Sequence, residues 1–151
     1  MGDLTEILRH EQFSLVDLPK VAASLARQLP VSGVVAVHGE MGVGKTTMIR
    51  ALLQIWGAEE EGASPTFGLV HHHQVHRAGR HAEVRHMDLY RLQDEEEAER
   101  SGIAEMLEQP GLSLVEWPER VPGLMPEDAW LLLMQGTSDG RRTCILSKLG
   151  S

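Results

Sequence analysis

Hydrophobic positions in the first part of the chain alternate between helical spacing and short unbroken runs. Val21, Leu25 and Leu29 recur on one face of a helix, and Asp17, just before them, is typical of a helix N-cap. Residues 33–38 (GVVAVH) form a valine-rich run, which predicts a short buried strand. The pattern therefore predicts a helix followed by a buried strand.

A second helix is predicted over residues 45–56, directly after a glycine-rich turn at residues 39–44. Met48, Leu52 and Ile55 share one face of this segment, which we expect to pack against the core. The succession of buried strand, turn and amphipathic helix is typical of an α/β fold.

The second half of the chain combines two predicted hairpins with an acidic helix and another buried strand. Gly79 can take the positive φ that a tight turn needs in the first hairpin. In chain order, the predicted elements are residues 66–76 with 81–90 for the first hairpin, 93–108 for a helix broken near Ser101 and Gly102, 112–116 for the strand, and 129–135 with 143–148 for the second hairpin.

Length and charge limit the classes of function. With 151 residues and no internal repeat or long linker, residues 1–151 are expected to form a single domain. Acidic residues outnumber basic ones by 22 to 14, which gives a formal net charge of -8. This balance opposes broad binding to nucleic acid or to an anionic membrane surface.

The single cysteine and the N-terminal residues bear on the compartment. Cys144 cannot form an internal disulfide, which is typical of a reducing compartment, and its apolar neighbours predict a buried thiol. Asp3 and Glu6 stand where a secretory signal would be basic and then apolar. No apolar run has the length of a membrane span. We therefore expect a cytoplasmic protein with no membrane contact.

Residues 39–47 (GEMGVGKTT) match the phosphate-binding pattern G-x-x-x-x-G-K-[ST] without a substitution. Glycines such as Gly39 and Gly42 let backbone N–H groups converge on phosphate oxygens. Lys45 supplies a charge for the β- and γ-phosphates, and the Thr46 hydroxyl can ligate Mg2+. With a strand before it and a helix after it, the motif predicts a three-layer, P-loop NTPase-like sheet, with a parallel core and antiparallel hairpin additions.

The P-loop indicates nucleotide binding without naming the nucleotide. The chain contains no asparagine, so the N-K-x-D motif that reads guanine in G proteins cannot occur. This absence favours ATP over GTP.

Two carboxylates compete for the acidic position that a P-loop ATPase needs at the end of a neighbouring strand. Glu116 ends the apolar run of residues 112–115, as expected of a strand beside the P-loop strand. Asp88 follows a more polar run, typical of a sheet edge or a hairpin arm. We favour Glu116 and keep Asp88 as the alternative. Thr66 could respond to the γ-phosphate as a switch residue does, or simply begin a strand.

Further motifs follow the P-loop in a fixed order. They are Ser64-Pro65-Thr66-Phe67, His86-Met87-Asp88-Leu89-Tyr90-Arg91-Leu92 and Val115-Glu116-Trp117-Pro118-Glu119. In these motifs, and over essentially its whole length, the chain resembles the TsaE family of small P-loop ATPases, which act in bacterial threonylcarbamoyladenosine biosynthesis in tRNA.

The resemblance implies roles for individual residues. Thr46 and Glu116 would be Mg2+ ligands, Asp88 would matter for hydrolysis, and Thr66 would be switch-like. Glu40 departs from the aspartate that is usual in the family, but no implied ligand is lost. The implied ATP-binding residues are Gly39, Gly42, Val43, Gly44, Lys45, Thr46, Thr47 and Trp117, and the implied catalytic residues are Lys45, Asp88, Glu116 and Thr66.

The resemblance also implies partners. Members of the family act with TsaB and TsaD, whose complex transfers the threonylcarbamoyl group, and their ATP hydrolysis supports repeated turnover and is weak without those partners. Contact with tRNA would then be indirect, through the complex. Two other readings of the P-loop stay open: a small kinase acting on a small molecule or nucleoside, and an adaptor that binds ATP and rarely hydrolyses it.

Six histidines crowd the first predicted hairpin. His71 and His73 would face one side of a strand and could ligate a metal with a third group. The spacing matches no closed zinc site, so a solvated hairpin face is the preferred interpretation. The set is His71, His72, His73, His76, His81 and His86.

Overall fold

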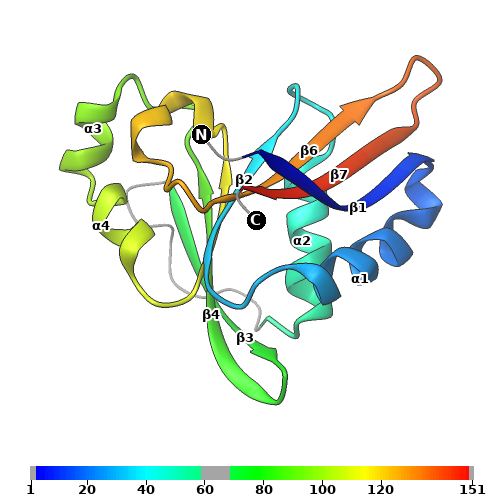
Figure 1. The fold of residues 1–151 in the computed structure, drawn as a ribbon, viewed down its shortest axis with the longest axis horizontal. Coiled ribbons are helices and arrows are strands. Elements are labelled where there is room, and N and C mark those ends of the chain that lie inside the picture. Colours follow the sequence, from blue (N-terminus) through cyan, green and yellow to red (C-terminus); the bar gives the residue numbers. More distant parts are fainter. Residues whose placement is uncertain (1–2, 59–68, 150–151) are drawn as a thin grey trace.

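The computed structural model describes residues 3–58 and 69–149, which form one seven-stranded sheet with helices on both faces (Figure 1). The strand order is β1-β7-β6-β2-β5-β4-β3. The strands are β1 (Leu4–Phe13), β2 (Gly33–His38), β3 (Val70–Arg77), β4 (Arg80–Asp88), β5 (Leu112–Glu116), β6 (Trp130–Gly136) and β7 (Arg142–Leu149). The helices are α1 (Leu18–Gln28), α2 (Lys45–Ile55), α3 (Glu95–Arg100) and α4 (Ile103–Glu108).

The centre of the sheet is parallel and its flanks are antiparallel. Strand β2 pairs in parallel with β5 and β6, and β5 pairs in parallel with β4. The pairs β1–β7, β6–β7 and β3–β4 are antiparallel. This arrangement confirms the predicted parallel core with antiparallel hairpin additions.

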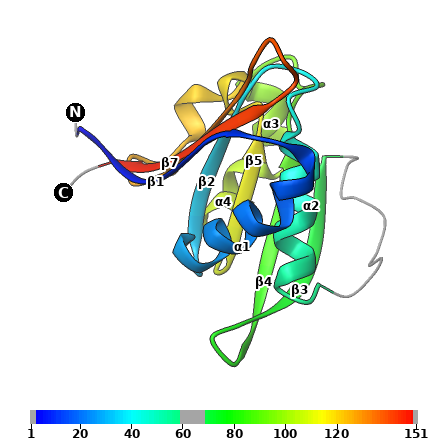
Figure 2. The same cartoon turned by 90° about the vertical axis from the view of Figure 1, so that its right-hand side faces the viewer.

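Two hydrophobic cores lie on opposite faces of the sheet. Helices α1 and α2 pack over Val35 and Val37 of β2, whereas α3 and α4 pack over Val34 on the other face. Figures 1 and 2 show the two helix pairs on either side of the sheet. The valine-rich run is buried on both faces because it is the central parallel strand. The three-layer prediction is confirmed.

The β3–β4 hairpin is tied to the helical layer beside it. Its turn residues Ala78 and Gly79 both have positive φ, 52° and 77°, as a two-residue hairpin turn requires. Arg77 donates hydrogen bonds to carbonyl groups at the end of α1, and its guanidinium stacks on Trp56 after α2. The part of this hairpin predicted over residues 66–68 lies outside the described residues.

Two features differ from the sequence-based expectations. Strand β1 was not predicted, because its mixed sequence is exposed over most of its length and it is held by pairing with β7 at the sheet edge. Ile55 is 45% exposed, so its placement on the core face was wrong. The buried face of α2 runs through Ile49 and Leu53 as well as Met48 and Leu52, and Ile55 lies about 90° from its centre.

None of the described helices combines the length and the apolar character that crossing a membrane would require.

Candidate nucleotide-binding site

The glycine-rich loop joins the end of β2 to the start of α2 and packs against β6. Gly42 and Gly44 have φ of 82° and 103°, a region of backbone conformation that residues with a side chain rarely adopt. A Cβ atom on Gly39 would lie 2.8 Å from the Met134 carbonyl oxygen and from Val43 Cγ1. The loop therefore needs glycine at two positions for conformation and at a third for close packing.

Lys45 begins α2 and bends back over the loop. Its ammonium donates a hydrogen bond to the Gly39 carbonyl and lies 3.6 Å from the centre of the Trp117 ring. Burial lowers the pKa of Lys45, and the charges of nearby carboxylates, Glu116 foremost, oppose that shift. The Lys45 ammonium is thus a desolvated positive charge beside the glycine-rich loop.

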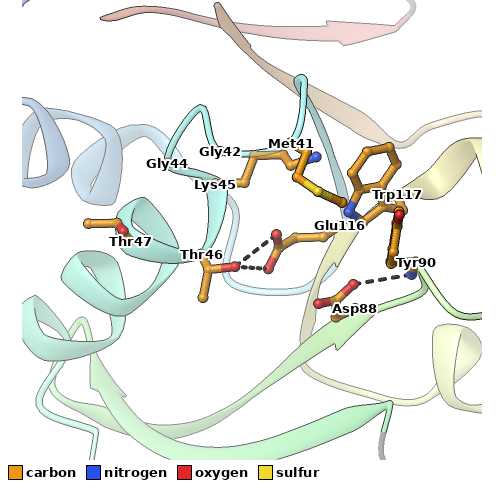
Figure 3. Close-up of a pocket in the computed structure, with 10 residues that line it drawn as sticks. All are labelled: Met41, Gly42, Gly44, Lys45, Thr46, Thr47, Asp88, Tyr90, Glu116 and Trp117. Carbon is orange, nitrogen blue, oxygen red and sulfur yellow. Dashed lines mark hydrogen bonds between the residues drawn. The ribbon is translucent and has the colours of Figure 1, made fainter. Parts of the chain in front are cut away.

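Glu116 and Thr46 meet at the carboxyl end of the parallel strands. Strand β5 lies beside β2, and Glu116 is level with Val37, the penultimate residue before the loop. The Thr46 hydroxyl lies 3.0 Å from Glu116 Oε1 and 2.8 Å from Oε2 (Figure 3). The strand position that favoured Glu116 over Asp88 therefore brings it to the hydroxyl of the P-loop.

His86 is the third member of this cluster, and the sequence analysis missed its role. Its Nε2 lies 2.6 Å from Glu116 Oε2 and its side chain is buried, so its assignment to a solvated hairpin face was wrong. His71, His72, His76 and His81 are exposed. A signal was available: the two-residue period of a strand puts His86 on the same face as Asp88.

The ionisation of Glu116 is set by opposing effects. Burial raises its pKa, but hydrogen bonds from His86 and Thr46, together with the charges of His86 and Lys45, outweigh that effect and lower the pKa below its ordinary value. The carboxylate therefore stays ionised although only 3% of the residue surface is exposed.

Asp88 ends β4, which lies inside the sheet between β5 and β3. The run before Asp88 is therefore an arm of the β3–β4 hairpin, as one of the two predictions had it, and not an edge of the sheet, which was the other. Asp88 stands level with Glu116 in the parallel register. Its exposed carboxylate accepts a hydrogen bond of 3.1 Å from the Tyr90 backbone N–H. The centre of the Tyr90 ring lies 5.0 Å from the centre of the Trp117 ring. Tyr90 thus shapes the site, a role the sequence analysis did not assign.

A cavity of about 330 Å³ brings most of the predicted residues together (Figure 3). A second cavity of about 360 Å³ lies on the β6–β7 side of the loop, where Val43 and Arg142 line it. Gly39 supports the loop from behind, and Thr66 lies outside the described residues. The residues around the first cavity include Gly42, Gly44, Lys45, Thr46, Thr47, Asp88, Glu116 and Trp117.

The oxygen atoms at Thr46 and Glu116 suit a small hard cation. Mg2+ takes oxygen ligands such as hydroxyl and carboxylate groups. The Thr46 hydroxyl and the Glu116 carboxylate supply two such groups, which lie within hydrogen-bond distance of each other at 2.8 and 3.0 Å. The described residues contain no group of three metal-ligating side chains, and Mg2+ typically needs only one or two from the protein beside phosphate oxygens.

Comparison with known proteins fixes the family. The family model described as "Threonylcarbamoyl adenosine biosynthesis protein TsaE" matches residues 14–144. The chain belongs to the TsaE family. The family indicated by the three motifs and the P-loop is thereby confirmed.

Relatives in the TsaE family cover most of the chain. A protein of Haemophilus influenzae named "tRNA threonylcarbamoyladenosine biosynthesis protein TsaE" is 33% identical over 98% of this chain and 92% of its own length. A protein of the same name from Treponema pallidum is 31% identical over 85% of this chain and 92% of its own. The crystal structure of Bacillus subtilis YdiB has a TM-score of 0.70 at 20% identity, covers 99% of this chain and 88% of that one, and supports the fold.

Proposed function

We propose that the chain is the ATP-binding and ATP-hydrolysing subunit that supports threonylcarbamoyl transfer to adenosine of tRNA, together with TsaB and TsaD. The observation that carries this proposal is the contact of Thr46, in an intact P-loop, with the ionised Glu116 at the end of the adjacent parallel strand. A nucleotide phosphate and a divalent cation need that combination side by side. We also propose that residues 1–151 act as one domain, in the cytoplasm where tRNA is modified.

Phosphate binding is assigned to the loop and the start of α2. Backbone N–H groups of Gly42 to Thr47 would surround the β-phosphate, and the helix N-terminus would add its partial positive charge. Lys45 would leave the Gly39 carbonyl for the β- and γ-phosphates, since ionised phosphate oxygens are stronger acceptors than a carbonyl. The nucleoside would extend into the second cavity, where Phe13, Leu15 and Leu18 supply apolar surface.

The residues for Mg2+ are Thr46 and Glu116, with Glu116 acting directly or through a water molecule. When bound, the cation would neutralise charge on the β- and γ-phosphates. Asp88 faces the same cavity and is exposed, so we assign to it the orientation of the attacking water. Thr66 is proposed as the residue that responds to the γ-phosphate.

Phosphate release, measured with and without TsaB and TsaD, tests the function. We expect slow phosphate release by the isolated chain and faster release when the TsaB–TsaD pair is added. The Lys45→Ala variant should release no phosphate with or without the pair, because it lacks the charge that faces phosphate. Transfer of phosphate to an added nucleoside or small molecule would instead identify a kinase. ATP binding with no release under any condition would identify an adaptor.

A further inference from the structure

His86 has no part in the roles assigned above, yet it makes the shortest polar contact to Glu116. Its Nε2 is 2.6 Å from Oε2, against 2.8 and 3.0 Å for the Thr46 hydroxyl. An ionised carboxylate can only accept hydrogen bonds. With Glu116 as a carboxylate, the 2.6 Å contact is a hydrogen bond that His86 Nε2 donates.

The two donors to Glu116 come from different elements. Thr46 stands in the first turn of α2, whereas His86 lies inside β4, which pairs on both sides. The Thr46 hydroxyl contacts both carboxylate oxygens, whereas His86 contacts Oε2 alone. The contact from His86 to Oε2 adds a second fixed point from a strand that is itself held by two neighbours.

A competing charge stands nearby. The Lys45 ammonium and the Glu116 carboxylate line the same cavity, and their opposite charges attract each other. A carboxylate drawn to Lys45 would leave the cation position and would neutralise the charge that phosphate needs. Holding Glu116 toward Thr46 therefore protects two functions of the site at once.

We propose that His86 is a positioning residue that holds the Glu116 carboxylate beside Thr46, in the orientation that serves Mg2+, and away from Lys45. This inference rests on the proposed function, because it assigns His86 to the cation half of that site. Removing a hydrogen-bond donor behind a metal-binding carboxylate typically weakens metal binding by roughly tenfold to a hundredfold.

Four variants test the assignment. Gln and Asn both keep a polar side chain at position 86, but only Gln carries an N–H as many bonds from Cβ as histidine Nε2 does. His86→Leu removes the donor and keeps apolar packing. His81→Leu makes the same change on the same strand at an exposed position near the turn.

The measurement is nucleotide binding by titration calorimetry across a Mg2+ series and in EDTA, with thermal unfolding as a check on folding. We expect His86→Leu and His86→Asn to raise the Mg2+ concentration for half-maximal binding about tenfold or more, with affinity in EDTA unchanged. His86→Gln should restore most of the loss, and His81→Leu should match the wild type. In a Glu116→Gln background, His86→Asn should add nothing.

Three results would overturn the proposal. An unchanged Mg2+ midpoint in the Leu and Asn variants, or equal losses in Asn and Gln, would leave His86 with a packing role. Additive effects with Glu116→Gln would mean that His86 acts by another route. Wild-type binding that is the same in Mg2+ and in EDTA would contradict the proposed cation site itself, which separates that failure from a failure of His86 alone.

Discussion

Glu116 and Asp88 are level with each other on adjacent strands, but their surroundings differ. Glu116 is buried and contacts Thr46, whereas Asp88 is exposed and accepts a backbone N–H. We expect Glu116→Gln to retain nucleotide binding but to lose its Mg2+ dependence, because the neutral amide is a poor Mg2+ ligand. We expect Asp88→Asn to keep that dependence and to slow hydrolysis about a hundredfold or more. Calorimetry measures the Mg2+ dependence of nucleotide binding, and phosphate release measures hydrolysis. Loss of the Mg2+ dependence in Asp88→Asn and not in Glu116→Gln would mean that the two residues have exchanged roles.

Cys144 provides a test of burial at a single residue. It is fully buried on β7, and this burial raises the pKa of its thiol from 9.0 to about 11. A raised folded-state pKa means that the stabilising effect is complete below the unfolded value and is lost as pH rises through the folded one. Between pH 9.0 and about 11, the thiol should therefore reduce the free energy of unfolding, by at most about 1.4 kcal/mol per pH unit.

The comparison for Cys144 is the Cys144→Ala variant, in denaturant titrations across the same pH range. Subtracting the two stability curves removes the contribution of other groups that titrate there. A difference curve that is flat with pH would mean that the thiol is solvated in the folded state, and rapid alkylation of the native protein would show the same.

At the residue scale, the sequence predicted Lys45, Thr46 and Glu116 because a local motif or a strand end marks each of them. His86 was misassigned because its partner lies thirty positions away along the chain and meets it only when β4 and β5 pair. Tyr90 packs on the Trp117 ring, which is likewise a tertiary contact. Chemistry carried by one segment is therefore readable from sequence, whereas supporting contacts between strands are not.

At the scale of elements, the β6–β7 hairpin supports the phosphate-binding loop. Arg142 Nε donates to the Val43 carbonyl, and its Nη1 donates to the Gly140 carbonyl at 2.8 Å. We expect Arg142→Ala to weaken nucleotide binding about tenfold, because an unpaired carbonyl in this loop costs ~1.4 kcal/mol of preorganisation. Calorimetry measures the affinity, and hydrogen exchange over residues 39–46 should report a looser loop.

The neighbouring Arg141 is a matched control for that change. It is exposed and pairs with Asp139 and with the Gln12 carbonyl, away from the P-loop. Arg141→Ala should leave nucleotide affinity within about twofold, as surface changes usually do. Equal losses in the two variants would show that the hairpin turn, and not the Arg142 contact, supports the loop.

Boundaries between elements could be predicted where a residue at the turn itself determines the backbone conformation. Gly102 has a φ of 77° and separates α3 from α4, as the predicted break near Ser101 and Gly102 required. Strand β1 carried no such signal, since its hydrogen bonds come from β7 at the other end of the chain. The contribution of the β6–β7 turn to the nucleotide site was also invisible, because Arg142 meets Val43 only after the sheet has assembled.

At the scale of the molecule, several basic residues are already engaged within the fold. Arg85 is 1% exposed and donates to Ser113 and to backbone carbonyls after α4. Arg77 binds the end of α1, and Arg142 binds the phosphate loop. The net charge of -8 further opposes the phosphate contacts through which a protein releases counterions from a nucleic acid.

We therefore expect the isolated chain to bind tRNA weakly or not at all, and to dock instead on the TsaB–TsaD pair in an ATP-dependent way. Mg-ATP would contact Thr66 through the γ-phosphate and complete a surface that the partners recognise, and hydrolysis would remove that contact. Pull-down with TsaB–TsaD in an ATP analogue, in ADP and without nucleotide measures this, with strongest capture expected in the analogue. Equal capture in all three would contradict the switch, and tight, salt-sensitive tRNA binding by the lone chain would contradict the charge argument.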